Sequence, residues 1–141
     1  MAHDMLTIRI PGEIRGKGRP RFSARRGGFA RAYTDGRTAN AESLIRLCAV
    51  EQVGQPCLEG PLTLSMAITV SIPASWSKRK QGDALVGLIR PTGKPDLDNS
   101  VKLACDALNG VVWRDDSQLV RVSISKQYGV APGAILEVGT A

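Results

Sequence analysis

The strongest constraint on the fold is a stretch in which apolar and polar side chains alternate strictly. From Leu62 to Ile72, every second residue is Leu, Met, Ile or Val, and the residues between them are Thr, Ser or Ala. Strict alternation predicts a half-buried β-strand, because successive side chains of a strand point to opposite faces. Pro73 ends the stretch. The chain is therefore expected to build a sheet with one apolar face that other elements cover.

Shorter patterns predict the remaining elements. Helical spacing of apolar residues predicts two helices, Thr38–Val53 and Asn99–Asn109, the second stopped by Asn109-Gly110. Further strands are predicted at Leu6–Ile10, Val111–Trp113, Gln118–Lys126 and Ala134–Val138. A short helix between Trp76 and Lys94 is left undecided. The order predicts an α+β fold with a mixed β-sheet and helices packed on one face, in a single domain spanning residues 1–141.

The net charge indicates a polyanionic partner. The chain carries 19 Lys and Arg against 13 Asp and Glu, a net charge of +6, which fits nucleic acid or an anionic membrane surface. Eight of the basic residues lie between Arg15 and Arg37, in a glycine-rich arm or hairpin. Such a segment is either a solubilising loop or a DNA-binding arm, and its candidate DNA contacts are Lys17, Arg19, Arg21, Arg25 and Arg26.

Other residue types argue against several classes of protein. The three cysteines form no C-x-x-C pair, so neither a disulfide framework nor a cysteine zinc site is expected. The single histidine, His3, lies near the N-terminus, which argues against a Ser-His-Asp or Cys-His mechanism. There is no apolar run of roughly 18 residues and no signal-peptide pattern. We therefore expect a cytoplasmic protein with no membrane partner.

Aspartates bracket the predicted helix Asn99–Asn109. Asp96 and Asp98 come just before it, and Asp115 and Asp116 follow it. In a basic chain, an acidic cluster repels the anionic partner that the remaining charge attracts, unless a divalent cation binds there and reverses the local charge. The cluster is therefore a candidate metal site.

The spacing of the first two aspartates suits a shared cation. Pro95 favours extended backbone before it, and in an extended segment Asp96 and Asp98 turn to the same side. Lys102 follows Asp98 by four residues, one helical turn on, where its ammonium could hold a phosphate. The structural alternatives stay open: a helix cap at Asp98, and a Lys102 that only pairs with Asp106.

The second pair supplies a possible third ligand. Adjacent strand residues face opposite sides, so one of Asp115 and Asp116 is expected to turn toward the first pair, although an ordinary turn would have the same composition. Oxygen donors without Cys or His suit Mg²⁺ or Mn²⁺. Such an ion activates water and neutralises the charge that builds on a phosphodiester during hydrolysis.

The segment that contains these residues resembles a known family signature. The stretch K-P-D-L-D-N-S-V-K-L-A-C-D-A-L-N-G-V-V-W-R-D-D-S-Q-L-V, residues 94–120, is similar to the signature of the RusA family of Holliday junction resolvases, found in bacteria and their phages. Gly16–Phe22, G-K-G-R-P-R-F, is similar to the K-x-R-P-R region of the same family. The resemblance implies a homodimeric, Mg²⁺-dependent endodeoxyribonuclease. Such an enzyme makes paired nicks in four-way DNA junctions during recombination and repair.

The resemblance also implies roles for individual residues. The family's catalytic, metal-binding aspartates match Asp96, Asp98 and Asp116, with Asp115 as the fallback, and its essential lysine matches Lys102. Asn99 occupies a motif position, and Asn99 and Lys94 join the arm residues as candidate DNA contacts. Two alternatives remain: a non-catalytic junction- or RNA-binding module, and a metal-dependent nuclease for other branched substrates. The sequence leaves the number of metal ions, the dimer surface and a host or prophage origin open.

Overall fold

The computed structural model describes residues 5–14, 21–24, 30–33 and 36–141, with side chains described for 5–14 and 40–141. Its strands are β1 (Leu6–Pro11), β2 (Arg21–Ala24), β3 (Ala30–Tyr33), β4 (Leu62–Ser71), β5 (Leu119–Gly129) and β6 (Gly133–Thr140). Its α-helices are α1 (Gly36–Val53), α2 (Lys78–Leu85) and α3 (Leu97–Leu108), and a 3₁₀ turn, η1, covers Asp116–Gln118. This order confirms the predicted α+β class.

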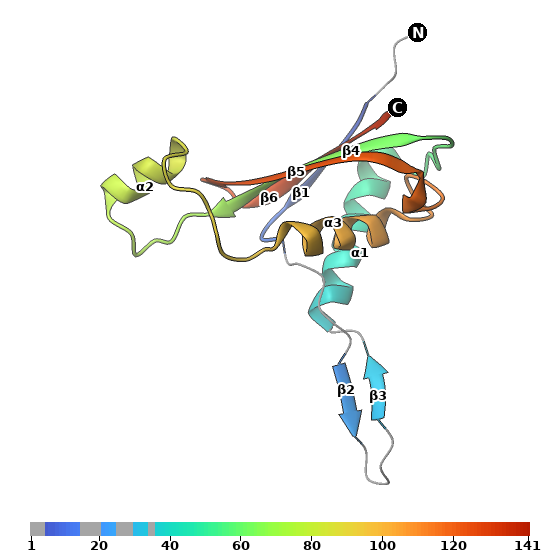
Figure 1. Cartoon of the computed structure of the whole chain (residues 1–141), viewed down its shortest axis with the longest axis horizontal. Helices are drawn as coiled ribbons and strands as arrows, with labels where there is room; N and C mark the ends of the chain where they lie inside the picture. The colour runs from blue at the N-terminus through green and yellow to red at the C-terminus, as the bar shows by residue number, and fades with distance from the viewer. Residues whose placement is uncertain (1–4, 15–20, 25–29, 34–35) are drawn as a thin grey trace.

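Four strands form the central sheet. Their order is β1-β6-β4-β5, with β4 and β5 parallel and the two other pairs antiparallel. Helices α1 and α3 lie on one side of this sheet, whereas α2 lies beyond its end (Figure 1). The predicted mixed sheet with helices on one face is therefore confirmed, with α2 as an addition that the face-packing prediction did not include.

The alternation along β4 separates the core from the open face of the sheet. Leu62, Leu64, Met66 and Ile68 are each at most 1% exposed and belong to one apolar cluster. That cluster also takes side chains from both covering helices, among them Ile45, Cys48 and Ala49 of α1 and Leu103, Ala104 and Leu108 of α3. Burying a side chain of this size contributes about 1.5–3 kcal/mol. The position of α3 over the sheet is thus set by its apolar stripe, which leaves its opposite face to solvent.

The predicted strand Val111–Trp113 is wrong. These residues form a tight turn in which the N–H groups of Val111 and Val112 both donate to the carbonyl of Leu108 at 3.0 Å. Gly110 has a φ of +78°, a left-handed conformation that glycine adopts without steric cost. All three predicted strand residues are buried. Among the described residues, the segment makes only isolated β-bridges, from Trp113 to Leu58 and Asn109, and joins neither sheet. Its apolar character therefore reflects burial rather than membership of a sheet.

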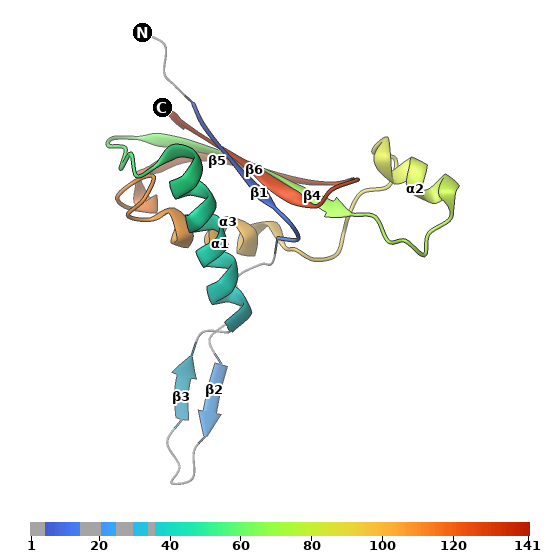
Figure 2. The same ribbon diagram turned by 180° about the vertical axis from the view of Figure 1, so that it is seen from behind.

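Two segments project from the central body. Strands β2 and β3 pair antiparallel, which confirms the hairpin alternative for 21–24 and 30–33, and the pair extends away from the start of α1 (Figures 1 and 2). Helix α2 extends from the far end of the sheet in both views. No helix of the described residues is long and apolar enough to cross a membrane.

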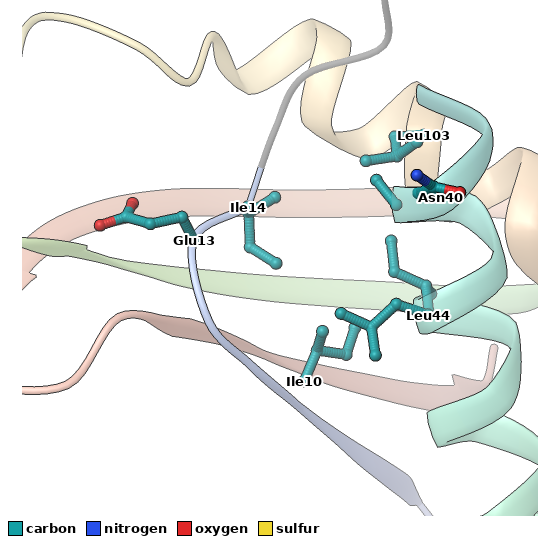
Figure 3. Close-up of a pocket in the computed structure, with 8 residues that line it drawn as sticks. Ile10, Glu13, Ile14, Asn40, Leu44 and Leu103 are labelled. Carbon is teal, nitrogen blue, oxygen red and sulfur yellow. The ribbon is translucent and has the colours of Figure 1, made fainter. Parts of the chain in front are cut away.

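An apolar pocket of about 280 Å³ lies on the covered side of the sheet. Aliphatic side chains line most of it, including Ile10 of β1, Leu44 of α1 and Leu103 of α3, while the carboxylate of Glu13 points away from them (Figure 3). None of the aspartates of the predicted metal site lines this pocket. The candidate site therefore lies outside this pocket, on the solvent side of α3.

Candidate active site along helix α3

Asp96 stands at the N-terminal end of α3. It is the N-cap residue, but its side chain makes no capping hydrogen bond. Its backbone carbonyl accepts from the N–H and the hydroxyl of Ser100, at 3.0 and 2.8 Å. Its carboxylate Oδ2 instead accepts from Asn99 Nδ2 and Lys94 Nζ, each at 3.3 Å. With 46% of its side chain exposed, Asp96 presents a carboxylate to solvent from a firmly held backbone.

Asp98 and Lys102 share the exposed face of α3. Asp98 lies in the first turn of the helix and Lys102 lies one turn later, where residues four apart are neighbours; both are exposed. The prediction that Asp98 continues an extended segment is wrong, because Asp96 already caps the helix. Both carboxylates nevertheless lie at the positive end of the helix dipole, which favours negative charge.

Lys126 braces the segment that leads into Asp96. Its ammonium donates to the carbonyls of Gly93 at 2.6 Å and Pro95 at 3.1 Å, across the Lys94–Pro95 peptide bond, which is cis. Lys126 belongs to β5, 31 residues further along the chain than Pro95. The sheet therefore holds the segment before the first aspartate in place through one side chain.

Asp116 lies at the other end of α3. Its Oδ2 accepts from Asn109 Nδ2 at 3.4 Å, and Asn109 Oδ1 in turn accepts from the indole N–H of Trp113 at 2.7 Å. Trp113 is fully buried. A buried indole thus fixes the orientation of the Asn109 amide, and that amide holds the carboxylate of Asp116 beside the helix.

Asp115 has a different task from its neighbour. It caps η1: its carboxylate accepts from the N–H of Ser117 at 3.0 Å. Hydrogen bonding with the Ser117 side chain, and then with its backbone N–H, lowers the pKa of the Asp115 carboxyl. The side chain of Gln118 completes a capping box by accepting from the N–H of Asp115 at 3.1 Å. Gln118 also donates to the carbonyls of Leu58 and Gly60. The carboxylate of Asp115 is therefore used within the turn, while that of Asp116 turns toward α3.

The carboxylates form two groups rather than one. Asn109 follows Asp98 by eleven residues, about 16 Å along a helix axis at ~1.5 Å per residue. Between the groups lies Cys105, whose pKa is raised to about 12 by burial and then by the negative charges of Asp116 and Asp106. Where side chains are described, no three His, Cys, Asp or Glu residues lie close enough together to hold one metal ion. The three-aspartate ligand set stays a prediction.

The donor chemistry of the first group fits Mg²⁺. Asp96 and Asp98 are oxygen donors on a helix N-terminus, and Mg²⁺ is usually bound by one or two carboxylates together with water and substrate phosphate. A neighbouring ammonium is available from Lys94, 3.3 Å from Asp96. The pair is therefore suited to hold a hard divalent ion with an anionic substrate beside it.

The candidate DNA contacts fall into two sets. Lys94 and Asn99 both donate to Asp96, so they lie at the candidate site. The side chains of Lys17, Arg19, Arg21, Arg25 and Arg26 lie outside the described residues.

Sequence reasoning missed the supporting residues Lys126, Asn109 and Gln118. Only the capping box offered a local signal, because Asp115 and Gln118 are three residues apart.

Comparison with known proteins identifies the family of the chain. Residues 11–139 match the family described as "Endodeoxyribonuclease RusA". The chain is also 34% identical, over 131 residues, to a Bacillus subtilis (strain 168) protein named "Uncharacterized protein YqaN", with 92% of each chain covered. The match spans nearly the whole chain, including both ends of α3 and the strands that support them. The chain belongs to the RusA endodeoxyribonuclease family.

Proposed function

We propose that this protein is a Mg²⁺-dependent endodeoxyribonuclease, with Mn²⁺ as a possible substitute, that resolves four-way DNA junctions by paired nicks in recombination and repair. The whole chain, residues 1–141, acts in this proposal as one endonuclease domain. The observation that carries it is the solvent-facing group of Asp96, Asp98 and Lys102 on the first two turns of α3, in a chain of the RusA family.

Each residue of the group has a distinct part. Asp96 and Asp98 would hold the ion, and Asp116 would be the third ligand once DNA is bound. Mg²⁺ held there would supply an activated water and positive charge beside the phosphate. Lys102 donates to the scissile phosphate or to the charge that develops on it. Asn99, which donates to Asp96, steadies that carboxylate.

The choice of Asp116 over Asp115 rests on their hydrogen bonds. Asp115 already accepts from Ser117 in the turn, whereas the Asp116 carboxylate is contacted by the Asn109 amide through a long bond of 3.4 Å. A weakly engaged carboxylate is easier to recruit as a ligand than one that caps a turn.

A homodimer belongs to this proposal, because a junction with two-fold symmetry offers two equivalent scissile phosphates. The outward face of α1 supplies exposed aliphatic area for such an interface: Leu47 and Val50 are 55% and 36% exposed. Sedimentation of wild type and Leu47→Glu tests it. We expect a dimer for the wild type and a shift toward monomer for the variant. A monomeric wild type at micromolar concentration would reject the dimer.

The central experiment is a cleavage assay on end-labelled synthetic four-way junctions with Mg²⁺, Mn²⁺, Ca²⁺ or EDTA. We expect paired nicks with Mg²⁺ and none with EDTA. Asp96→Asn should retain junction binding and lose cleavage by at least about 10³-fold. Glu137→Gln, an exposed carboxylate on the open face of the sheet, is the matched control and should cut normally.

Three results would overturn the proposal in different ways. Equal nicking by wild type and Asp96→Asn would reject the assigned site. Preferential cleavage of flaps, linear duplex or RNA would keep the nuclease but reject the junction as its substrate. Tight junction binding without cleavage under any of these metals would instead support a non-catalytic binding module.

A further inference from the structure

The net positive charge of the chain lies in two segments. Residues 15–37 and 76–94 hold 13 of the 19 Lys and Arg but only two of the 13 Asp and Glu, so together they carry +11 while the remaining residues carry −5. The first segment is the N-terminal basic arm described above. The second, residues 76–94, is here called the α2 arm. A polyanion attracted to this chain is therefore drawn to two separate places on either side of an acidic body.

The α2 arm is anchored rather than loose. The Trp76 ring packs edge-on against Tyr128 of β5, with 5.4 Å between ring centroids. Lys80 Nζ lies 4.0 Å from the centroid of the Trp76 ring, and Gln81 Nε2 donates to the Trp76 carbonyl at 2.8 Å. At its other end, the Lys126 ammonium holds the carbonyl of Gly93. A positively charged element fixed at both ends is pre-organised for binding.

Three basic side chains of this arm have no partner among the side chains that the structure describes. Lys78, Arg79 and Arg90 are exposed, and among the residues with described side chains none of the three makes an ion pair or a side-chain hydrogen bond. Lys78 and Arg79 lie in the first turn of α2, which contains no acidic residue. Cations there oppose the helix dipole. A bound phosphate would relieve that conflict.

We propose that the α2 arm is a second DNA-binding surface, with Lys78, Arg79 and Arg90 contacting backbone phosphates of a DNA branch that leads away from the Asp96 site. The inference rests on the proposed function. The arm continues in sequence into Asp96, the N-cap of α3, and Figure 1 places its helix α2 beyond the sheet end, well away from the β2–β3 hairpin. One branch of a junction would lie on the hairpin and another on the α2 arm, which brings the phosphates between them to the acidic centre.

The tip of the arm adds apolar contacts to this surface. Leu85, Val86 and Leu88 are 50%, 74% and 76% exposed. Proteins that open or bend DNA often place aliphatic side chains against base steps next to basic residues. An anionic membrane would also accept a basic arm with an aliphatic tip. DNA is favoured because the arm is continuous with the candidate site.

The test compares two double variants that each remove two arginines. Arg79→Ala/Arg90→Ala changes the α2 arm, and Arg9→Ala/Arg121→Ala changes exposed arginines on β1 and β5. Junction affinity is measured by fluorescence anisotropy with Ca²⁺ at several salt concentrations. For the arm variant we expect affinity to fall about tenfold or more, and the slope of log K against log salt to fall by about 0.9 for each phosphate that is no longer bound. The control should change neither quantity measurably.

Cleavage of saturating junction then separates this inference from the function it rests on. The arm variant should cut at the wild-type rate once bound, because the catalytic group is intact. Failure of the wild type to cut would reject the proposed function, yet leave the arm's salt dependence measurable. Unchanged affinity in the arm variant, or an equal loss in the control, would overturn the inference. So would arm-dependent binding to phosphatidylserine vesicles without any effect on DNA binding.

Discussion

The two ends of α3 hold their carboxylates by different means. At the N-terminal end, Asp96 is the N-cap and Asp98 lies in the first turn of the helix, and the side-chain partners of Asp96, Lys94 and Asn99, lie within three residues of it. At the C-terminal end, Asp116 depends on an amide fixed by the buried Trp113. The arrangement at the N-terminal end is made by residues that are close together in the sequence. The arrangement at the C-terminal end exists only when the core has formed.

This difference predicts how the two ends respond when each loses one charge. Asp98→Asn should lower junction cleavage by at least about 10³-fold, and Asp116→Asn by about 10²-fold, because the first ligand pair is built into the helix while Asp116 joins it upon binding. The measurement is the single-turnover cleavage rate at saturating Mg²⁺, with junction affinity measured in parallel.

Asp115→Asn is the matched control for Asp116→Asn, since it removes a charge from the next residue in the chain. It should leave the cleavage rate within a few-fold of wild type, because Asp115 serves as a cap. A larger loss from Asp115→Asn than from Asp116→Asn would exchange the roles proposed for the two residues.

The N-terminal end of α3 also depends on one residue that is distant in the sequence, Lys126. Lys126→Met removes both hydrogen bonds to the carbonyls of Gly93 and Pro95 while keeping the length of the aliphatic stem. We expect the cleavage rate at limiting Mg²⁺ to fall by about 10–100-fold, the usual cost of losing support behind a metal ligand. Excess Mg²⁺ should recover much of that loss.

Lys126→Arg tests whether positioning is the cause. An arginine can still donate to two carbonyls, so this variant should restore most of the activity and lower the Mg²⁺ concentration required. If Lys126→Met and Lys126→Arg lose cleavage equally at all Mg²⁺ concentrations while both fold, the hydrogen bonds of Lys126 have no part in metal binding.

The same contrast explains what sequence could and could not predict. The strand Leu62–Ile72 and both long helices followed from periodicity, and the structure has them within two residues as β4, α1 and α3. Val111–Trp113 was misassigned, because three consecutive apolar residues do not distinguish a strand from a buried turn.

The supporting residues of the candidate site could not be predicted from local sequence patterns. Lys126 contacts carbonyls 31 and 33 residues away, and the Gln118 amide donates to carbonyls 58 and 60 residues away. Contacts of such sequence separation are set by the parallel pairing of β4 with β5, which no periodicity encodes. Asn109 was identified only as a helix stop, since an amide at a helix end has that role by default.

Trp113→Phe should weaken the C-terminal end selectively. It removes the indole N–H that fixes Asn109 Oδ1, which leaves a partly buried acceptor without its donor at a cost of about 1–3 kcal/mol in the free energy of unfolding. Urea unfolding measures that loss. Cleavage should fall by roughly tenfold as Asp116 loses its oriented partner, and excess Mg²⁺ should recover part of that loss because Asp116 is the proposed third ligand. An unchanged Mg²⁺ midpoint would show that Asp116 takes no part in holding the ion.

The smallest expected effect concerns Cys105, whose thiol lies between the two ends of α3. Its titration should make the free energy of unfolding depend on pH. Cys105 is 8% exposed, and burial with the nearby charges of Asp116 and Asp106 raises its pKa from 9.0 to about 12. The folded state therefore favours the neutral thiol, and this stabilisation is complete below pH 9 and is lost as the pH rises toward 12. Relative to Cys105→Ala, the wild type should lose on the order of 1 kcal/mol of unfolding free energy between pH 7.5 and 10. A difference that is constant over this range would mean that burial and the nearby charges do not raise the pKa of Cys105.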